Sequence, residues 1–220
     1  MGLTLYYHPL ASYCHKVLIA LYEHDIAFAA RIINMGEAGD RSELQVHWPF
    51  CKFPVIHDHE RKRDVPESSV IIEYLDHYYS RRRKLIPDDF NAALQVRLWD
   101  RIFDNYVQGP MQEIVSDRLH GKGGDLAGAR ATLATAYGLI DRQMEPGPWI
   151  AGPDFSMADC AAAPALFYAG TVQPFPEECR HLVAYFARLV DRPSVRRVLE
   201  EAKPYFELYP FSSAIPARFR

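Results

Sequence analysis

Two side chains able to do chemistry stand two positions apart near the start of the chain, the hydroxyl of Ser12 and the thiol of Cys14. They lie in the stretch PLASYCHKVLIALYE, where an extended pattern gives way to helical spacing. A serine in the first turn of a helix can donate a hydrogen bond to an anion that the helix N-terminus also attracts. A cysteine is a nucleophile only where its thiolate is stabilised. The pair therefore indicates either anion stabilisation by Ser12 or thiol chemistry by Cys14.

The spacing of the apolar residues separates these two interpretations. Cys14, Val17, Leu18 and Leu21 follow one another at i, i+3, i+4 and i+7, which predicts a helix face buried in a core. A thiol in apolar surroundings has a raised pKa and is unreactive, so Cys14 is interpreted as core packing. Ser12 remains the candidate for chemistry, and a plain helix N-cap is its alternative role.

The elements that must position these residues alternate between strands and helices over residues 1–80. The helix after residue 67 is expected to bury Val70, Ile71, Tyr74 and Leu75 on one face. A polar turn between the third and fourth strands predicts a hairpin. These elements predict a small mixed sheet with helices packed on it. The expected strands span 3–8, 27–34, 53–58 and 62–66, and the expected helices span 14–23, 40–48 and 67–79.

The remainder of the chain shows no strand pattern. Residues 80–91 read SRRRKLIPDDFN, which is linker composition, so a domain boundary is placed between 80 and 90 and the basic run at 81–84 is interpreted as a solvated linker. A capping box of Ser156 and Asp159 is expected to start one helix. The second domain should be entirely helical, with helices within 92–107, 126–144, 157–170, 179–192 and 194–206.

Bulk composition narrows the class of function. A net charge of −3 among 220 residues gives no reason to expect nucleic acid or a membrane surface as partner. No apolar run reaches the length of a membrane helix and no leader segment is visible, so a cytoplasmic protein is expected. The four cysteines form no C-x-x-C pair, which fits a reducing compartment. The histidines near HDHE are interpreted as solvated polar residues, and no metal site is expected.

Four motifs together resemble those of the cytosolic glutathione transferases over essentially the whole chain. ASYCHKVLIAL is similar to the first active-site helix of bacterial members, KFPVIHD to the loop with a cis-proline, PESSVIIEYL to the helix start that holds the γ-glutamyl end, and GPDFSMADCAAAPAL to the capping module of the second domain. The resemblance implies an α/β thioredoxin-like domain over 1–82 that binds glutathione, followed by an all-α helical domain over 90–220 that carries an electrophile pocket.

The resemblance also implies which residues bind glutathione as co-substrate. Phe53, before a cis Pro54, offers its backbone to the cysteinyl group. Lys52 reaches the glycyl carboxylate. Glu67 pairs with the γ-glutamyl ammonium, and Ser68 with the helix N-terminus takes the γ-glutamyl carboxylate.

One position departs from the family pattern. Where members usually carry the serine that stabilises the glutathione thiolate, this chain has Ala11, whose side chain donates no hydrogen bond. The neighbouring Ser12 is predicted to take over that role as the catalytic residue. Classes that use a cysteine for disulfide exchange carry it at the position of Ala11, which again leaves Cys14 to the core.

The resemblance also implies that the second domain forms the pocket for the electrophile, which accepts the glutathione sulfur. Phe103, Tyr106 and Val107 are predicted to share one helix face before a break at Gly109 and Pro110. The resemblance makes Tyr106 and Met111 candidates for the electrophile pocket, although core packing is the other interpretation of that face.

The resemblance therefore implies a homodimeric glutathione transferase that acts in detoxification. Such an enzyme catalyses the attack of the glutathione thiolate on small hydrophobic electrophiles. Two alternatives stay open. One is a glutathione-dependent isomerase of the maleylacetoacetate type, whose motif has adjacent serines. The other is a glutathione-binding protein with weak or no catalysis, which the alanine at position 11 favours.

Overall fold

A computed structural model describes residues 2–80, 84–145 and 147–220. The chain divides into two compact units, Met1–Leu85 and Ile86–Arg220, and each is described by itself. Three of the four residues of the basic run predicted as a solvated linker, 81–83, lie outside the described residues. Among the described helices, none combines the length and the apolar character needed to cross a bilayer.

The first unit is built around a four-stranded mixed sheet with the strand order β2-β1-β3-β4. Strand β1 pairs in parallel with β2 and antiparallel with β3, and β3 pairs antiparallel with β4. The predicted hairpin is therefore confirmed. The elements are β1 Leu3–Tyr7, α1 Ser12–Glu23, β2 Ala29–Ile32, α2 Ala38–His47, β3 Val55–Asp58, β4 Arg63–Pro66 and α3 Ser68–Tyr78.

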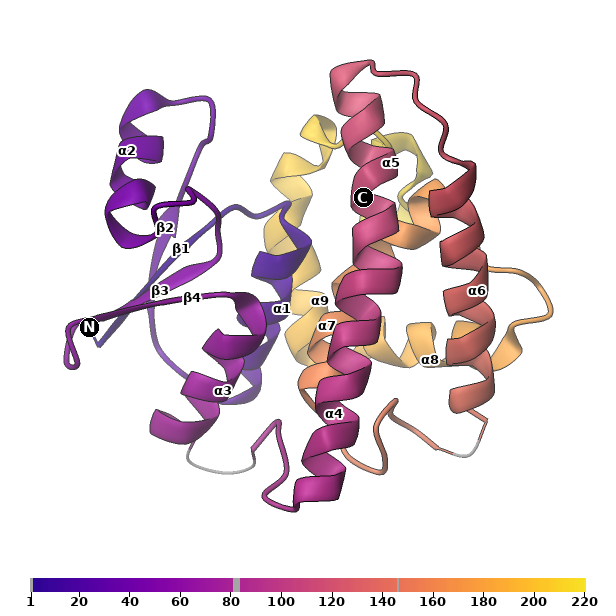
Figure 1. Cartoon of the computed structure of the whole chain (residues 1–220), viewed down its shortest axis with the longest axis horizontal. Coiled ribbons are helices and arrows are strands. Elements are labelled where there is room, and N and C mark those ends of the chain that lie inside the picture. The colour runs from indigo at the N-terminus through magenta and orange to yellow at the C-terminus, as the bar shows by residue number, and fades with distance from the viewer. Residues whose placement is uncertain (1, 81–83, 146) are drawn as a thin grey trace. The chain divides into compact units, whose positions relative to one another are not determined.

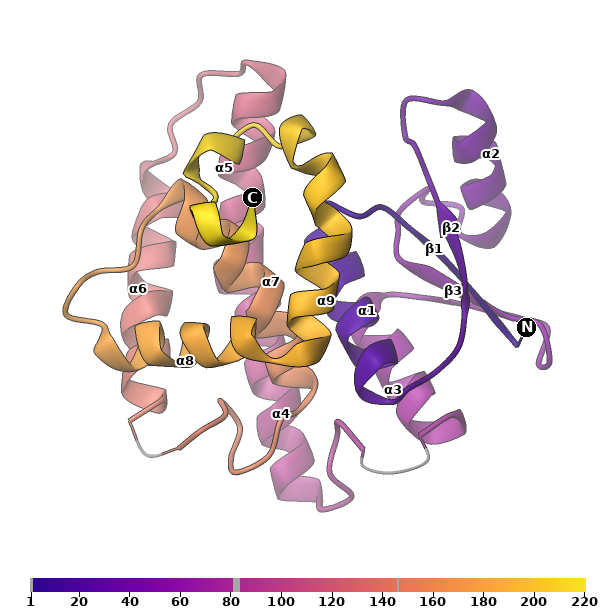
Figure 2. The ribbon, with the colours of Figure 1, turned by 180° about the vertical axis from the view of Figure 1, so that it is seen from behind.

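The helices of this unit cover both faces of the sheet. Helices α1 and α3 lie side by side on one face and α2 lies on the other (Figures 1 and 2). The stripe predicted on α1 is confirmed, because its four apolar residues are all buried. The face predicted for α3 is wrong at Val70, which is 54% exposed. Ile72 is buried instead, since the buried face of α3 is centred on Ile71, Ile72 and Leu75.

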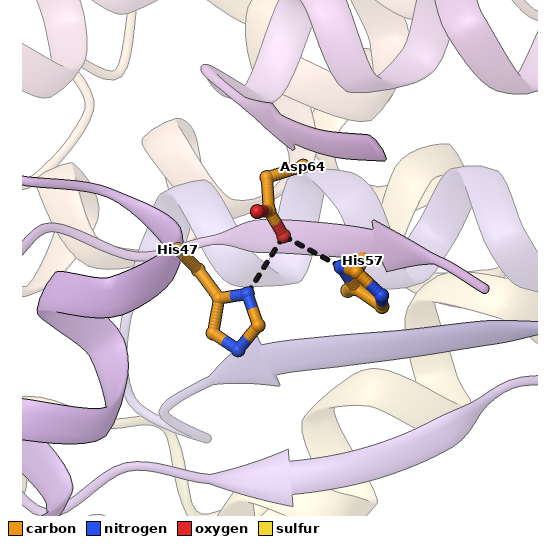
Figure 3. Close-up of side chains that lie close together, drawn as sticks. All are labelled: His47, His57 and Asp64. Atoms are coloured by element: carbon orange, nitrogen blue, oxygen red, sulfur yellow. Dashed lines mark hydrogen bonds and ion pairs between the residues drawn. The ribbon is translucent and has the colours of Figure 1, made fainter. Parts of the chain in front are cut away.

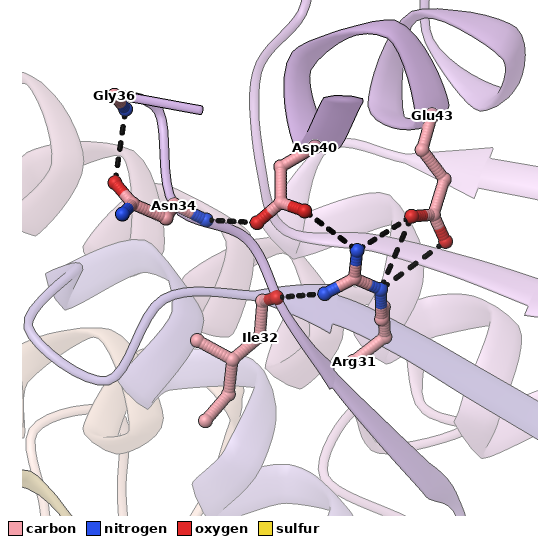
Figure 4. A network of polar contacts seen from close by, with 6 residues as sticks. All are labelled: Arg31, Ile32, Asn34, Gly36, Asp40 and Glu43. Atoms are coloured by element: carbon pink, nitrogen blue, oxygen red, sulfur yellow. Dashed lines mark hydrogen bonds and ion pairs between the residues drawn. The ribbon is translucent and has the colours of Figure 1, made fainter. Parts of the chain in front are cut away.

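Helix α2 is tied to the sheet by a polar network around Arg31 of β2 (Figure 4). The guanidinium donates hydrogen bonds to Asp40 at 2.7 Å and to Glu43 at 2.6 Å. The other carboxylate oxygen of Asp40 accepts the backbone N–H of Asn34 at 2.7 Å. Leu44, on the same helix, packs into a core cluster of the sheet. Charge pairing and apolar burial thus fix the helix between residues 38 and 47.

Among the described residues of the second unit, all regular secondary structure is helical, as predicted, apart from an isolated bridge between Trp149 and Gly152. Helix α7 is almost wholly buried at its centre. Its predicted capping box forms, and the Asp159 carboxylate accepts the Ser156 N–H at 2.9 Å. The elements are α4 Phe90–Ile102, the π-helix Phe103–Gln108, α5 Gly109–His120, α6 Ala127–Gln143, α7 Met157–Val172, α8 Arg180–Asp191, α9 Pro193–Ala202 and short 3-10 turns at Lys203–Leu208, Ser212–Ala214 and Ala217–Phe219.

The break predicted at Gly109 and Pro110 is wrong. The chain stays helical through both residues, because the π-helix directly before them widens the turn and α5 starts at Gly109. A proline inside a helix lacks its N–H and crowds the carbonyl four residues earlier, and the widened π-helical turn directly before Pro110 gives its ring more room. Helix α5 is consequently an element that the sequence reasoning did not identify.

Candidate functional site

The sheet register brings the three predicted glutathione-binding segments to one edge of the first unit. Val55 of β3 pairs with Tyr6 of β1 and with Pro66 of β4. Because β3 runs antiparallel to both neighbours, the chain leaves β1 and β4 at the same edge at which it enters β3. The segment before Ser12, the Phe53–Pro54 loop and the Glu67–Ser68 turn therefore converge there.

The loop between β1 and α1 is held by its own hydrogen bonds. The Ala11 N–H donates to the His8 carbonyl at 3.0 Å, and the Nε2–H of the buried His15 donates to the Pro9 carbonyl. Ala11 is the N-cap residue and Ser12 is the first residue of α1, with only 7% of its surface exposed. The alternative role of Ser12 as the N-cap is therefore wrong, and its hydroxyl lies in the first turn of the helix.

The second segment is the loop that leads into β3. The peptide bond between Phe53 and Pro54 is cis, as the resemblance implies. Lys52 is exposed, Phe53 is half-buried and Pro54 is buried. The rings of Phe53 and His8 stack with their centroids 6.1 Å apart, which joins this loop to the segment that precedes Ser12. Lys52 and Phe53 thus belong to a loop at the same edge as the start of α1.

The third segment contains Glu67, which is the predicted glutathione-binding residue with a strained backbone conformation. Glu67 has φ 68° and ψ 115°, outside the regions that residues other than glycine normally adopt. Its side chain is exposed and makes no capping bond to α3, while Ser68 begins the helix with 7% exposure. Strained residues cluster at ligand sites, where the surrounding structure maintains them. The geometry leaves the first N–H groups of α3 without a capping side chain.

Two hydrogen bonds align the helices that start at this edge. Lys16 Nζ donates to Ser69 Oγ at 2.9 Å, and His24 Nε2 lies 2.7 Å from Asp76 Oδ1. The first bond joins early turns and the second joins late turns, so α1 and α3 run parallel. Both N-termini, with their partial positive charge, therefore point to the same edge. An elongated ligand with two anionic groups suits this arrangement.

Cys14 does not belong to this chemistry. It is completely buried, and burial raises the pKa of its thiol to about 12, although a backbone hydrogen bond with His8 acts in the opposite direction. Its thiol is therefore protonated at neutral pH and cannot act as a nucleophile.

The two acceptor-site candidates lie in the second unit, and the structure does not bring them together. Tyr106 is 54% exposed in the π-helix, whereas Phe103 and Val107 are fully buried, so the predicted shared face is wrong. The widened turn rotates Tyr106 away from that face. Tyr106 lines an apolar pocket of about 530 Å³ against α6 with Ile102 and Leu139, and Met111 is buried in α5 outside this lining.

Sequence reasoning did not single out Gln108, the last residue of the π-helix. Only 2% of it is exposed, and neither amide atom has a hydrogen-bond partner among the described residues. Buried polar groups without partners and π-helical turns are both frequent at functional positions. The sequence offers only one signal for this residue, which is its place directly before Gly109 and Pro110.

One cluster in the first unit has the geometry of a metal-binding group. It consists of His47, His57 and Asp64 (Figure 3). His57 is one of the histidines expected from the sequence to be solvated, and no local pattern marks His47 or Asp64, because they come from a helix end and a different strand.

Comparisons with known proteins agree with this arrangement. The family model described as the N-terminal domain of glutathione S-transferase matches residues 5–83, and the model for the C-terminal domain matches residues 115–188. Glutathione S-transferase F7 of Arabidopsis thaliana is 25% identical over 209 residues, covering 90% of this chain and 99% of the relative. FtsZ-localized protein A of Caulobacter vibrioides is 28% identical over 212 residues, covering 91% and 92% respectively.

A solved structure gives the same result for the fold. A glutathione S-transferase from Methylobacillus flagellatus, solved with glutathione bound, superposes with a TM-score of 0.77 at 22% identity, covering 90% of this chain and 98% of that one. The thioredoxin-like sheet unit and the helical unit are those of this fold. Both domain models and the full-length relatives support one conclusion: the chain belongs to the glutathione S-transferase family.

Proposed function

We propose that this protein is a glutathione transferase that conjugates the glutathione thiolate to small hydrophobic electrophiles. The observation that carries the proposal is the parallel alignment of α1 and α3, whose N-termini point to the same edge as the Phe53–Pro54 loop. Glutathione is an elongated dianion at neutral pH once its thiol ionises, and two helix N-termini match its γ-glutamyl and thiolate ends.

Binding is assigned to residues of the first unit. The Ser68 hydroxyl and the first N–H groups of α3 take the γ-glutamyl carboxylate, and the Glu67 carboxylate pairs with the ammonium group. The backbone of Phe53, before the cis Pro54, pairs with the cysteinyl backbone of glutathione. The exposed Lys52 ammonium meets the glycyl carboxylate. Each assignment matches a charged or polar group of the tripeptide with an opposite partner.

Catalysis is assigned to Ser12 and the N-terminus of α1. An unperturbed thiol titrates near about 8.5, so the site must stabilise the thiolate to make it abundant at neutral pH. The Ser12 hydroxyl donates one hydrogen bond to the sulfur, and the first-turn N–H groups and the helix dipole add favourable electrostatics. The bound thiolate then attacks the electrophile directly, without a covalent intermediate on the protein.

The electrophile is assigned to the second unit, whose residues from 90 onward form the acceptor domain. Tyr106 and Met111 stay the candidates for acceptor binding, as aromatic and thioether side chains suit varied apolar substrates.

A homodimer is part of the proposal. Exposed apolar side chains on α4 at Phe90, Leu94 and Leu98 follow one another at i, i+4 and i+8, which makes a stripe suited to a partner subunit. We place the protein in the cytoplasm, since all four cysteines are free thiols.

A glutathione-binding protein with weak or no catalysis is the second candidate function. Ala11 favours it, because the usual donor is absent at that position. A relative that covers 91% of this chain is named for its localisation with FtsZ and not for transfer chemistry. The glutathione-binding residues would then be kept while efficient activation of the thiol is lost.

An ultraviolet titration of bound glutathione separates the two candidates. Thiolate absorbance would be followed against pH in the native protein, in Ser12→Ala and in the control Ser213→Ala, whose exposed serine lies in the second unit. We expect the bound thiol pKa to fall well below about 8.5 in the native protein and the control, and to rise towards that value in Ser12→Ala. Tight binding with an unshifted pKa in all three proteins would overturn the transferase proposal in favour of the binding protein.

A further inference from the structure

Three potential metal ligands meet on the α2 side of the sheet, outside the proposed glutathione site. His47 Nδ1 and His57 Nδ1 lie 2.7 Å and 2.8 Å from the same oxygen of Asp64 (Figure 3). The two nitrogens and the carboxylate oxygen all lie within 4.8 Å of one another. His47 ends α2, His57 lies on β3 and Asp64 lies on β4, so three separate elements supply one cluster.

The backbone holds this cluster in place before any ion binds. His57 and Asp64 are directly opposite partners in the antiparallel ladder between β3 and β4, which fixes their separation. The His47 ring packs against the Tyr6 ring of β1 with centroids 4.2 Å apart. The Arg31 network and the burial of Leu44 anchor the rest of α2. Binding therefore requires little rearrangement of the main chain.

The ligand chemistry selects a class of ion. Two imidazole nitrogens with one carboxylate oxygen suit Zn²⁺ and other late first-row divalent metals, whereas Mg²⁺ and Ca²⁺ prefer oxygen ligands alone. Ligand atoms bound at about 2.0–2.2 Å in a tetrahedral site are separated by roughly 3.3–3.5 Å. The two nitrogen to oxygen distances must thus open by less than about 1 Å, which small side-chain rotations of these half-buried groups can supply.

The cluster is also accessible and suitably charged. The side chains of His47, His57 and Asp64 are 15%, 23% and 33% exposed, so an ion can enter from solvent and retain water ligands. The neighbouring Arg63 directs its guanidinium to the Tyr74 ring, 5.9 Å from the centroid, on the α3 side of the sheet. His59, the next histidine, has its Nε2 engaged with Thr4 Oγ1 at 2.8 Å and is not part of the ligand set.

We propose that this face binds one divalent transition-metal ion, with Zn²⁺ as the reference ion, through His47 Nδ1, His57 Nδ1 and the Asp64 carboxylate. Water completes the coordination, as at zinc sites with three protein ligands. In the metal-bound form each ring carries its proton on Nε2, so that the Nδ1 lone pair faces the ion. The inference does not depend on the glutathione proposal, because none of the three ligands belongs to the glutathione-binding set.

Calorimetric titration of the untagged, chelator-treated full chain with Zn²⁺ tests the site. We expect one ion per chain, and a loss of affinity of more than about tenfold in both His57→Gln and Asp64→Asn, since even outer partners of metal ligands are typically worth that much. The control His120→Gln removes an exposed histidine of the second unit and should bind as the native protein does. Circular dichroism would verify that each variant is folded.

Cobalt provides a second readout that needs no variant. Co²⁺ bound by two nitrogens and one oxygen should give visible d–d bands without the near-ultraviolet charge-transfer band of a sulfur ligand. A sulfur band would place the ion on a cysteine and overturn the proposal. Absence of zinc binding at millimolar concentration, or equal affinity in the native protein, His57→Gln and Asp64→Asn, would overturn it as well.

Discussion

Lys16 Nζ donates a hydrogen bond of 2.9 Å to Ser69 Oγ, and this bond joins the second turn of α1 to the first turn of α3. Lys16 is 1% exposed, which is rare for a lysine and requires hydrogen-bond partners for its ammonium. The bond lies one turn from Ser12 and directly beside Ser68. It therefore connects the two helix N-termini to which glutathione binding is assigned.

Replacing Ser69 by alanine should destabilise the first unit. The buried ammonium would lose an acceptor, and a hydrogen bond to a charged group is worth about 1.5–3 kcal/mol. We expect the free energy of unfolding, measured in urea, to fall by that amount and the affinity for glutathione to weaken as well. Ser213→Ala, at an exposed position, should change the unfolding free energy by less than about 0.5 kcal/mol. Equal stability of the two variants would show that the bond contributes nothing.

Asp58 should make stability depend on acid pH. This fully buried carboxylate accepts hydrogen bonds from the Tyr74 and Tyr79 hydroxyls, from the N–H groups of Glu60 and Arg61 and from the Arg61 guanidinium. Burial acts to raise its pKa, but these bonds outweigh it and hold the pKa well below its usual range. The folded state thus binds the proton less tightly than the unfolded state. Its stabilisation is complete above about pH 4 and is lost as the pH falls below that value.

Asp58→Asn tests this dependence. We expect the substitution to lower the free energy of unfolding by about 1.5–3 kcal/mol at pH 7, because the bonds to a charged acceptor are lost. The gap between the native protein and the variant should shrink at pH 3, because Asp58 takes up a proton there in the unfolded state while the folded state still holds the carboxylate ionised. Urea unfolding at both pH values measures it, with the exposed Asp191→Asn as control. A gap that does not change with pH would contradict the assignment.

The four thiols should differ in reactivity. Cys51 is half-exposed, whereas Cys14, Cys160 and Cys179 are buried. Burial raises the pKa of Cys14 to about 12, and burial together with Asp141 and Glu178 raises the pKa of Cys179. N-ethylmaleimide at pH 7 should therefore modify Cys51 first, as followed by mass spectrometry of peptides. In denaturant all four should react at similar rates. Labelling of Cys14 as fast as Cys51 in the folded protein would restore a chemical role for Cys14.

The fold was predictable for elements whose side-chain pattern is set by burial against a single core. The stripe of α1 followed from the spacing of its apolar residues, and the β3–β4 hairpin followed from the polar turn between two short strand patterns. The π-helix did not, because a shift in backbone hydrogen bonding leaves no mark in apolar periodicity. Tyr106 was consequently placed on a buried face that it does not join.

The candidate site was predictable only in its local segments. Motifs identified Ser12, Pro54 and Ser68 separately, and the strand register brings their segments to one edge. The bond between Lys16 and Ser69 spans 53 positions, and no local pattern signals it. Polar clusters of this kind depend on how distant elements pack, and side-chain type and spacing within one element do not contain that information.

Gln108 combines a π-helical position with a buried amide that has no partner among the described residues. Leaving a buried donor and acceptor unsatisfied costs about 1–3 kcal/mol, whereas an apolar side chain of similar shape costs nothing of this kind. Gln108→Met should therefore raise the free energy of unfolding by about 1 kcal/mol or more, measured in urea. Gln95→Met, at an exposed position of α4, should leave it within about 0.5 kcal/mol of the native value. A less stable Gln108→Met variant would show that the amide has a partner, such as a buried water, that stabilises the fold. A more stable variant with weakened turnover would instead mark Gln108 as a residue kept for function at a cost to stability.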